Sequence, residues 1–288
     1  MTAPRPQALR ADALARLPAL RLAHPGVFRA VTPGRVGVVL ALLLGTALLG
    51  LGIWRLEIEP ARLLSGFGQL LHFLTLMLPP QPDSWAQVRT VLHGLAETLA
   101  IAFLGTLVAA ILAFPLGLLA ARNTTVNAVV RFLSRRVLDG IRGVDELIWA
   151  LIWVSVVGLG PFAGVLAIIT ADIGIFGKLY SEAIEAADRK AEEGVIASGG
   201  SRPARIGFGI LPEVLPVMAG QGLYWFESNV RSSTIIGIVG AGGIGLILAE
   251  MIRTLEWPVV SFIVALILVM VAVIDAISGR LRRRLMGV

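Results

Sequence analysis

The chain has 288 residues, of which 56% are hydrophobic and only 15% are charged, and it contains no cysteine. A charged fraction this far below the roughly 25% of ordinary soluble domains indicates a protein embedded in lipid. The lack of cysteine excludes a disulfide framework, a thiol nucleophile and a thiolate metal site, and the three scattered histidines form no metal-ligand spacing. The net charge of +6 does not indicate a nucleic-acid partner, because most arginines stand at the ends of apolar runs, where they orient a membrane protein.

Residues 1–35 form a basic segment, which we expect to be a cytoplasmic tail because its basic region is longer than that of a signal peptide. The apolar run from 36 to 54 is long enough to cross the membrane once. Residues 61–78 mix apolar and polar side chains, which favours a helix lying in the outer interface, with a membrane hairpin as the alternative. The segment 36–91 is therefore expected to hold the first transmembrane helix and an interfacial stretch.

Three more spans are predicted over residues 95–120, 144–158 and 162–180. Four arginines follow the first of these and mark a cytoplasmic loop by the positive-inside rule: Arg122, Arg131, Arg135 and Arg136. The last of the three leads into a polar, mixed-charge segment, residues 185–216. Four crossings that start from a cytoplasmic tail place this segment in the cytoplasm.

The apolar stretch from 206 to 249 is too long for one straight helix. Its roughly 44 residues would reach roughly 65 Å, against a hydrocarbon core of about 30 Å. The last apolar run, 259–277, precedes a basic cluster that should be cytoplasmic: Arg280, Arg282, Arg283 and Arg284. Residues 206–249 are therefore expected to cross once, along a broken path. The predicted fold is an all-α, polytopic membrane protein of about six transmembrane helices with both termini in the cytoplasm.

The polar segment from 185 to 216 reads EAADRKAEEGVIASGGSRPARIGFGILPEVLP, which is too charged to lie in hydrocarbon. An acidic, helix-forming run comes first, Gly199 and Gly200 stop it, and Leu211-Pro212 opens the next apolar segment. A helix lying across the cytoplasmic face can fill a groove on a partner and transmit its rigid-body motion. An ordinary charged surface loop is the alternative.

A second polar stretch, YWFESNVRSST over residues 224–234, lies inside the broken apolar segment, where ionisable groups are costly and face a cavity or each other. Glu227 and Arg231 are four apart and could simply pair on one helix face. The other interpretation is the path of a polar, anionic solute, because guanidinium and hydroxyl donors match oxyanions. Both interpretations can hold. The predicted path residues are Glu227, Asn229, Arg231, Ser232, Ser233 and Thr234.

Other ionisable residues fall in or beside the predicted spans: Asp145, Glu146, Asp172, Lys178 and Asp275. They could line the same path or pair with arginines such as Arg142.

The glycine-rich stretch GIVGAGGIG, residues 237–245, matches the G-x-G-x-x-G pattern of dinucleotide-binding proteins. That pattern requires a βαβ unit in a soluble doubly wound domain, and nothing else in the chain supplies one. Glycines at this density instead break a helix or let backbones approach closely within a membrane bundle. We therefore expect a gate or tight helix crossing at Gly237, Gly240, Gly242, Gly243 and Gly245.

Five motifs together resemble the phosphonate ABC transporter permease family: GLGPFAGVLA (158–167), GIFGKLYSEAIE (174–185), EGVIASGG (193–200), FGILPEVLP (208–216) and FESNVRSSTIIGIVGAGGIG (226–245). The resemblance covers residues 92–284 and implies a core domain with the type I ABC importer permease (MetI-like) fold. It further implies a bacterial inner-membrane protein that forms a homodimer and binds two cytoplasmic ABC ATPase subunits. An extracytoplasmic binding protein would deliver phosphonate or a related phosphorus oxyanion, such as phosphate or phosphite.

The resemblance assigns Glu193 and Gly199 to the ATPase-docking motif, within a cytoplasmic coupling loop at 181–206. The chain departs from the family pattern, because a glycine and a valine follow Glu193 where two alanines are usual, and Gly209 replaces an isoleucine. The predicted coupling residues are Glu185, Glu193, Gly194, Ala197, Gly199, Gly200 and Arg202.

The chain has no G-x-x-x-x-G-K-[ST] loop, so we expect ATP and Mg²⁺ to be bound by the partner ATPase and no cofactor or metal by this chain. An intramembrane enzyme is disfavoured, because no catalytic set is recognisable. The alternative function is an ion-gradient-driven secondary transporter of a small anion, which would need no ATPase.

Overall fold

The computed structural model describes residues 15, 17–19, 21–23, 33–57, 60–125 and 127–286, and every regular element among them is helical. The chain divides into two compact units, residues 1–71 and 72–288. The first holds α3 (Pro33–Arg55) and most of α4 (Pro60–Leu76). None of the side chains described in α3 is buried. Most of the predicted basic tail, residues 1–35, lies outside the described residues.

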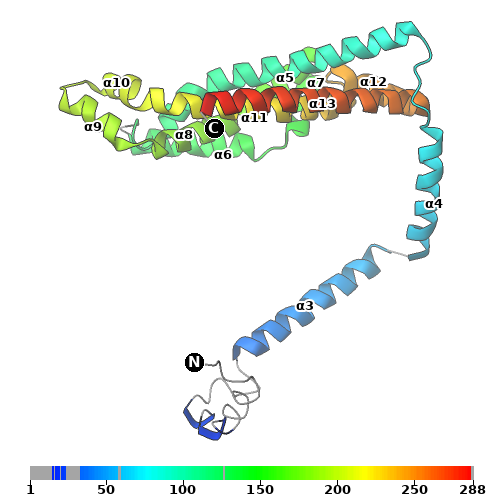
Figure 1. Cartoon of the computed structure of the whole chain (residues 1–288), viewed down its shortest axis with the longest axis horizontal. Helices are drawn as coiled ribbons and strands as arrows, with labels where there is room; N and C mark the ends of the chain where they lie inside the picture. Colours follow the sequence, from blue (N-terminus) through cyan, green and yellow to red (C-terminus); the bar gives the residue numbers. More distant parts are fainter. Residues whose placement is uncertain are drawn as a thin grey trace, which may run out of the picture. The chain divides into compact units, whose positions relative to one another are not determined.

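The second unit is a bundle of long helices with shorter helices at its ends (Figure 1). Its long helices are α5 (Trp85–Ala120), α8 (Pro161–Ala186), α11 (Leu211–Ile238) and α13 (Trp257–Met286). The shorter elements are α6 (Ala128–Arg142), α7 (Glu146–Val157), α9 (Arg189–Ala197), α10 (Arg202–Ala204), the π-helix η1 (Arg205–Ile210) and α12 (Gly243–Arg253).

Within the described ranges, five helices are long and apolar enough to cross a membrane: Val36–Arg55, Trp85–Ala120, Pro161–Ala186, Arg202–Ile238 and Trp257–Leu285. The prediction of an all-α, multi-span protein is confirmed. The predicted span at 144–158 differs, because it contains only the 12-residue helix α7. At 1.5 Å per residue α7 is roughly 18 Å long, too short to cross alone.

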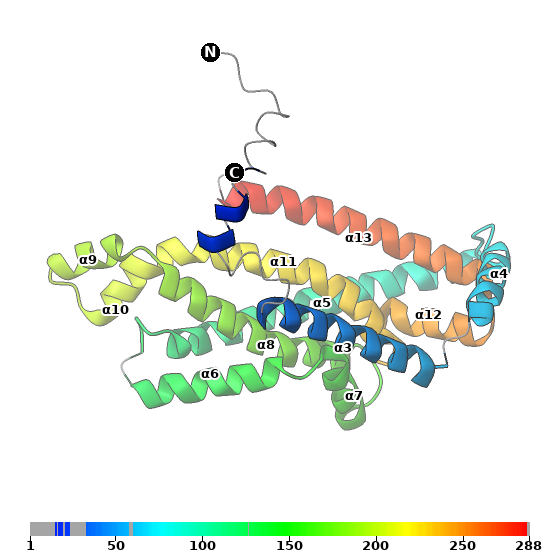
Figure 2. The ribbon, with the colours of Figure 1, turned by 90° about the horizontal axis from the view of Figure 1, so that it is seen from below.

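Helices α6 and α7 together bring the chain back between α5 and α8. A Cβ at Gly105 would touch Ile168, and one at Gly117 would touch Tyr180. Both pairs are 63 positions apart (168 − 105 and 180 − 117), so α5 and α8 run parallel and the chain between them must return. In Figure 2, α6 lies along α8, and α7 continues beyond it. Residues 128–142 form a helix in the bundle and not the predicted loop, whereas the cytoplasmic location of the arginines at 122–136 stays a prediction.

The predicted broken path at 206–249 is confirmed. The segment forms two helices, α11 and α12, which are separated by a break and run in the same direction. Their contacts with α5 move steadily toward its N-terminus: Asn229 with Thr106, Ile236 in one cluster with Ile101, Ile244 with Thr98, and Met251 with Gln87. The chain sidesteps between the two helices at Gly240 and Gly242, whose φ angles are +100° and +84°. Glycine tolerates this backbone, which side chains disfavour.

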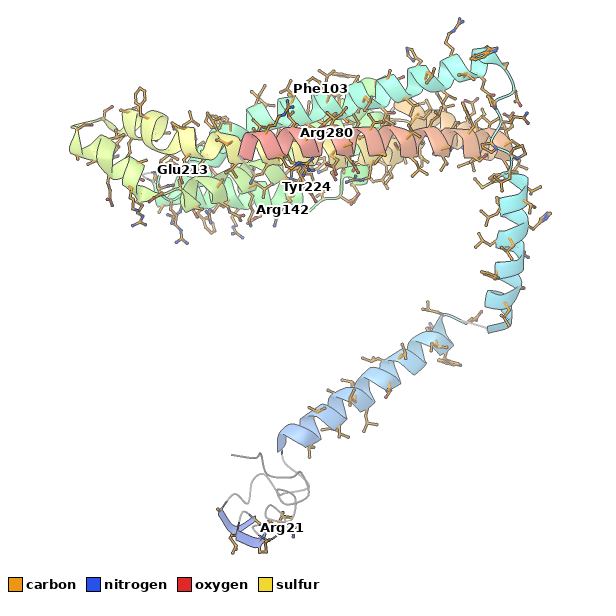
Figure 3. All side chains as sticks on the ribbon, in the orientation of Figure 1. Arg21, Phe103, Arg142, Glu213, Tyr224 and Arg280 are labelled. Atoms are coloured by element: carbon orange, nitrogen blue, oxygen red, sulfur yellow. The ribbon has the colours of Figure 1, made fainter. Side chains whose placement is uncertain are left out.

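Helix α13 then returns along α11, since Glu227 pairs with Arg282 and Arg231 pairs with Asp275. Side chains project from the whole length of this bundle (Figure 3), and Tyr224 lies on the α13 side, where the Arg282 guanidinium is 5.8 Å from its ring centroid. The α9–α10 pair stands at one end of the bundle and α12 at the other. The cytoplasmic location of both termini stays a prediction.

Candidate functional site

The segment that links α8 to α11 folds into the helix and glycine turn that the sequence indicates. The Asp188 side chain caps α9 by accepting a hydrogen bond from the Lys190 N–H (3.1 Å). At the other end, Gly199 has φ +77°, and the Gly200 N–H donates to the Val195 carbonyl (2.9 Å). This is a glycine C-cap, which ends the helix sharply.

Helix α9 packs one side on η1 and leaves the other side open. A Cβ at Gly209 would lie only 3.1 Å from the Glu192 Cα, so the two backbones are in close contact. A larger side chain at position 209 would therefore require the backbone of α9 to shift. The exposed residues of α9 include Glu193, Gly194, Ile196 and Ala197, and of these Glu193 and Ile196 line a hollow between α9 and the bundle.

Glu185, also predicted to be a coupling residue, lies away from this open side and joins the ends of α5 and α8 to the middle of α6. Its Oε1 accepts hydrogen bonds from the Arg122 N–H and from Arg135 Nη2, both at 2.7 Å. The Arg135 Nε–H donates in turn to the Ala120 carbonyl (2.9 Å). The end of α8 is thereby fastened to the end of α5 and to α6.

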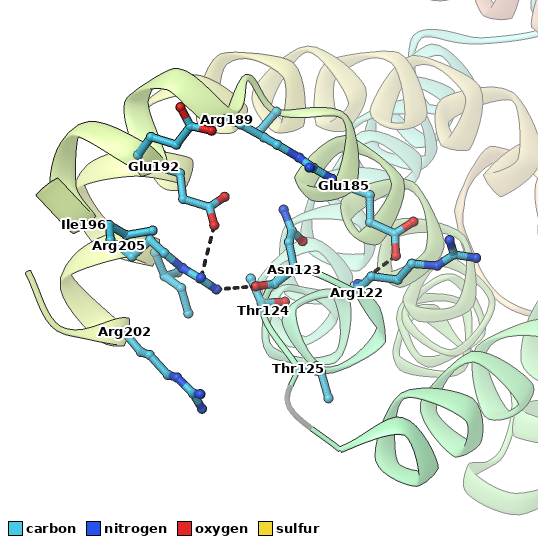
Figure 4. Close-up of a pocket in the computed structure, with 13 residues that line it drawn as sticks. Arg122, Asn123, Thr124, Thr125, Glu185, Arg189, Glu192, Ile196, Arg202 and Arg205 are labelled. Atoms are coloured by element: carbon cyan, nitrogen blue, oxygen red, sulfur yellow. Dashed lines mark hydrogen bonds and ion pairs between the residues drawn. The ribbon is translucent and has the colours of Figure 1, made fainter.

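Arg205 makes the corresponding connection from η1, and the sequence analysis did not select it as a site residue. Its Nη1 lies 3.1 Å from Glu192 Oε1 and its Nη2 donates to the Asn123 carbonyl (2.5 Å), as Figure 4 shows. The Asn123 side chain donates to the Ile184 carbonyl (2.7 Å). Arg205 therefore links α9, called the coupling helix below, to the loop after α5. In the sequence, its only signals were its charge and its position just before the apolar segment.

Asp139 on α6 holds Lys178, which the sequence analysis had considered for the solute path. Lys178 Nζ is 3.0 Å from one carboxylate oxygen of Asp139, and Arg136 Nη2 is 3.1 Å from the other. The hydrogen bond from Lys178 lowers the pKa of the Asp139 carboxyl below its ordinary value, and Coulombic attraction to Lys178 and Arg136 acts in the same direction. These pairs attach α6 to α8.

The charged residues on α11 form a chain of ion pairs with α13. Glu227 Oε2 lies 2.9 Å from Arg282 Nη2, while Arg231 Nη1 is 3.7 Å from Glu227 and 3.6 Å from Asp275. The structural interpretation of Glu227 and Arg231 as a pair is thus present in the fold. The Arg231 side chain is nevertheless 47% exposed and loosely held, because both of its ion pairs are longer than 3.5 Å.

Asn229 and Ser233 lie on another side of α11 and are buried. Asn229 Nδ2 donates to Thr106 Oγ1 (2.8 Å) and to Asp172 Oδ2 (2.5 Å), which joins α11 to α5 and α8. The Ser233 hydroxyl donates to the Asn229 carbonyl (2.6 Å). Asn229 therefore holds helices together in this structure, whereas the Ser233 hydrogen bond stays within α11.

Ser232 and Thr234 are half-buried. The Thr234 hydroxyl donates to the Val230 carbonyl (3.5 Å), and its own carbonyl lies where a Cβ at Gly245 would be. The six predicted path residues thus do not share one face of α11, and their role in solute passage stays a prediction.

The five predicted gate glycines gather at the break between α11 and α12. A Cβ at Gly237 would lie 2.9 Å from the Gly245 Cα, and one at Gly243 would lie 2.5 Å from Thr98 Oγ1. The Gly243 N–H donates to Glu97 Oε1 (3.1 Å). These close approaches explain why small residues are required here, whereas gating itself stays a prediction.

The turn before α8 packs on the same break. The Gly160 N–H donates to the Gly240 carbonyl (2.9 Å), and a Cβ at Gly242 would lie 2.7 Å from the Pro161 nitrogen. Two of the motifs that carry the family resemblance, at 158–167 and 226–245, therefore meet in space.

A family model described as "binding-protein-dependent transport system inner membrane component" matches residues 113–287. The chain belongs to this family. The permease is accordingly a multi-pass protein of the inner membrane, and the resemblance to ABC importer permeases is confirmed.

Two relatives show how far the likeness extends. The permease is 41% identical over 236 residues to HtxC of Stutzerimonas stutzeri, provisionally named a phosphite transport system permease protein, covering 82% of this chain and 83% of that one. It is 38% identical over 230 residues to the phosphate-import permease protein PhnE of Mycolicibacterium smegmatis, covering 80% of this chain but only 43% of PhnE.

A solved structure of the MetNI methionine ABC transporter in an inward-facing conformation has the same fold. Its permease-like chain superposes with a TM-score of 0.60 at 21% identity, covering 70% of this chain and 99% of that chain. The predicted MetI-like fold is confirmed.

Proposed function

We propose that this permease moves a phosphorus oxyanion, namely phosphonate, phosphate or phosphite, inward across the cytoplasmic membrane. The observation that carries the proposal is its likeness, over four fifths of the chain, to proteins named for phosphite and phosphate transport. The motif at 226–245 supports it, because an accessible arginine beside hydroxyl side chains suits an oxyanion. An extracytoplasmic binding protein would deliver the solute.

The driving force is proposed to come from two cytoplasmic ABC ATPase subunits that dock on the open side of α9. Movement of these subunits would pass through the rigid connections at Glu185 and Arg205 to the ends of α5 and α8 and to α6. Rigid-body motion of packed helices is a known way to switch access from one side of a membrane to the other. ATP and Mg²⁺ would be held by the ATPase, so this chain would be a permease and no enzyme.

The solute path is proposed to pass α11 at the exposed Arg231 and the half-buried Ser232 and Thr234, in a homodimer of permeases. The glycine break at 237–245 would open and close it. Asn229 would serve by keeping α11 in register with α5 and α8, and the buried Ser233 would stay bonded to the Asn229 carbonyl.

The test is uptake into vesicles that contain the permease with its co-expressed ATPase and binding protein. Labelled phosphate, phosphite and methylphosphonate are supplied outside, and ATP is trapped inside. We expect uptake of at least one of them that requires ATP and the binding protein. Uptake that proceeds without ATP and disappears when an ionophore collapses the ion gradient would instead establish a secondary transporter.

A further inference from the structure

A hollow of about 690 Å³ lies between the coupling helix and the end of the bundle, and the transport path does not include it (Figure 4). Helices α9, α10 and η1 form one wall of the hollow. The end of α8 and the loop that follows α5 form the other wall. Movement of the coupling helix against the bundle would therefore change its shape. The polar groups that matter in its lining are Arg122, Asn123, Arg189, Glu192, Arg202 and Arg205.

The hollow carries an excess of positive charge. Four arginines and three glutamates line it, and two of the glutamates already have partners: Glu192 pairs with Arg205, and Glu185 pairs with Arg135 outside the hollow. Across the described part of the chain, no carboxylate lies within ion-pair distance of three lining arginines: Arg122, Arg189 and Arg202. Among the lining carboxylates, only Glu193 remains to balance the positive charge of these three arginines.

Two buried polar atoms in the wall lack hydrogen-bond partners among the described residues. The Nε–H of Arg205 has no acceptor, although both terminal nitrogens of that guanidinium are engaged, and Oδ1 of Asn123 has no donor. Buried polar groups are almost always satisfied, so each such atom points to a missing partner. A ligand with several acceptor oxygens and one hydroxyl, such as hydrogen phosphate or a singly protonated phosphonate, carries the groups that both atoms lack, and the two side chains must shift to reach it because both atoms are buried.

The arginine side chains are placed to share such a ligand. Figure 4 shows Arg189 reaching from the start of α9 toward Asn123, while Arg202 stands on the α10 side of Arg205. Arg122 points away from Arg205 and contributes only through its charge. Arginine forks favour phosphate-type groups through charge-assisted hydrogen bonds.

We propose that this hollow is an oxyanion site that takes a phosphate-type group, either a free phosphorus oxyanion or the headgroup of an anionic phospholipid. A group bound between α9 and the bundle joins the two walls and resists displacement of the coupling helix. A bound ligand would thereby strengthen the connection that Arg205 makes and tighten the coupling of ATP hydrolysis to uptake. This consequence rests on the proposed function, whereas the binding itself does not.

The test measures binding of labelled inorganic phosphate to the permease–ATPase complex in phosphatidylcholine nanodiscs without ATP. Binding is compared in the unmodified protein, in Arg189→Gln and in the control Arg131→Gln, whose arginine lies on α6 outside the hollow. All three are repeated with Arg231→Gln, so that the transport path does not contribute. We expect saturable binding that Arg189→Gln weakens about tenfold and that Arg131→Gln leaves unchanged.

The Arg205→Lys variant keeps the charge but removes the Nε–H, and it should weaken phosphate binding as well. If Arg205→Lys does not fold, Arg189→Gln alone decides the question. Equal binding in Arg189→Gln and Arg131→Gln would overturn the proposal. So would binding seen only with the isolated permease, because the ATPase would then fill the hollow. Replacing phosphatidylcholine by phosphatidylglycerol separates the sources: weaker phosphate binding identifies a lipid headgroup, and unchanged binding identifies a free anion.

Discussion

The Glu192 carboxylate and the Arg205 guanidinium lie 3.1 Å apart and join α9 to the π-helix η1. Both side chains are mostly buried, at 17% and 24% exposure. Because Arg205 also donates to the Asn123 carbonyl, this pair connects α9 to the bundle as well as to its own neighbour.

Replacing Arg205 with alanine should uncouple ATP hydrolysis from uptake. Hydrogen bonds that involve a charged group contribute about 1.5–3 kcal/mol each, so the α9–bundle connection should loosen while the spans stay folded. We expect uptake in vesicles to fall at least about tenfold with ATPase activity retained. In a double-mutant cycle, Glu192→Ala should add little to Arg205→Ala. Additive losses would mean that the two residues act separately.

Arg231→Ala should impair uptake without impairing assembly. Its two carboxylate partners are more than 3.5 Å away, and loose, exposed pairs contribute about 0–1 kcal/mol. The melting temperature should therefore change little while transport is lost. The matched variant Arg282→Ala breaks the 2.9 Å pair with Glu227 and should destabilise the protein more. Uptake at the unmodified rate in Arg231→Ala would remove this residue from the solute path.

Asn229→Leu should be among the most destabilising single substitutions in the bundle. It removes two hydrogen bonds and leaves the buried Asp172 carboxylate without its amide partner, at a cost of at least about 1–3 kcal/mol. Thermal unfolding in detergent would measure the loss. Ser232→Ala, on the half-buried side of the same helix, should have a much smaller effect. A stable Asn229→Leu variant would show that this network does not hold the three helices.

Gly245→Ala should disrupt the break between α11 and α12. The added methyl would meet the Thr234 carbonyl and the Gly237 Cα, and overpacking of this kind costs about 1–3 kcal/mol. The control is Gly222→Ala, where nothing lies within 4 Å of the added Cβ. Because alanine favours a helix interior by up to about 1 kcal/mol over glycine, that variant should be as stable as the original or more so. Equal melting temperatures for the two variants would contradict the close packing at the break.

Asp139 predicts a pH dependence. Lys178 lowers the pKa of the Asp139 carboxyl in the folded state, so the pair stabilises the fold above the ordinary carboxyl pKa. That contribution disappears as the pH falls through the lowered value. Asp139→Asn should therefore reduce the melting temperature at pH 7, and the difference should shrink below about pH 4. A difference that stays constant from pH 7 to pH 3 would exclude the ionised carboxylate as its cause.

The predictions that succeeded from sequence alone rest on local patterns or on length. The glycine stop at Gly199 and Gly200 follows from backbone freedom, and the single broken crossing of 206–249 follows from counting residues against the membrane thickness.

The contacts that hold the site together could not be predicted, because they join residues far apart in the chain. Asp172 and Asn229 are 57 positions apart, and Arg205 and Asn123 are 82 apart. In each pair, the sequence around one residue gives no indication of which distant residue it contacts. The helix at 128–142 was missed for a different reason, since its arginines suggested a loop although the Asn127 side chain caps a helix there. Positive charge indicates the side of a membrane and does not exclude a helix.

The hydrogen bond from the Gly160 N–H to the Gly240 carbonyl connects the start of α8 to the glycine break, so α8 joins two regions at its opposite ends. One end meets the glycine break, and the other carries Glu185 and the coupling helix. A free-energy coupling between two sites acts equally in both directions. If nucleotide on the ATPase alters how tightly the break holds a solute, solute at the break must alter nucleotide affinity by the same factor. The transported solute would thus be an effector of the ATPase that drives its transport.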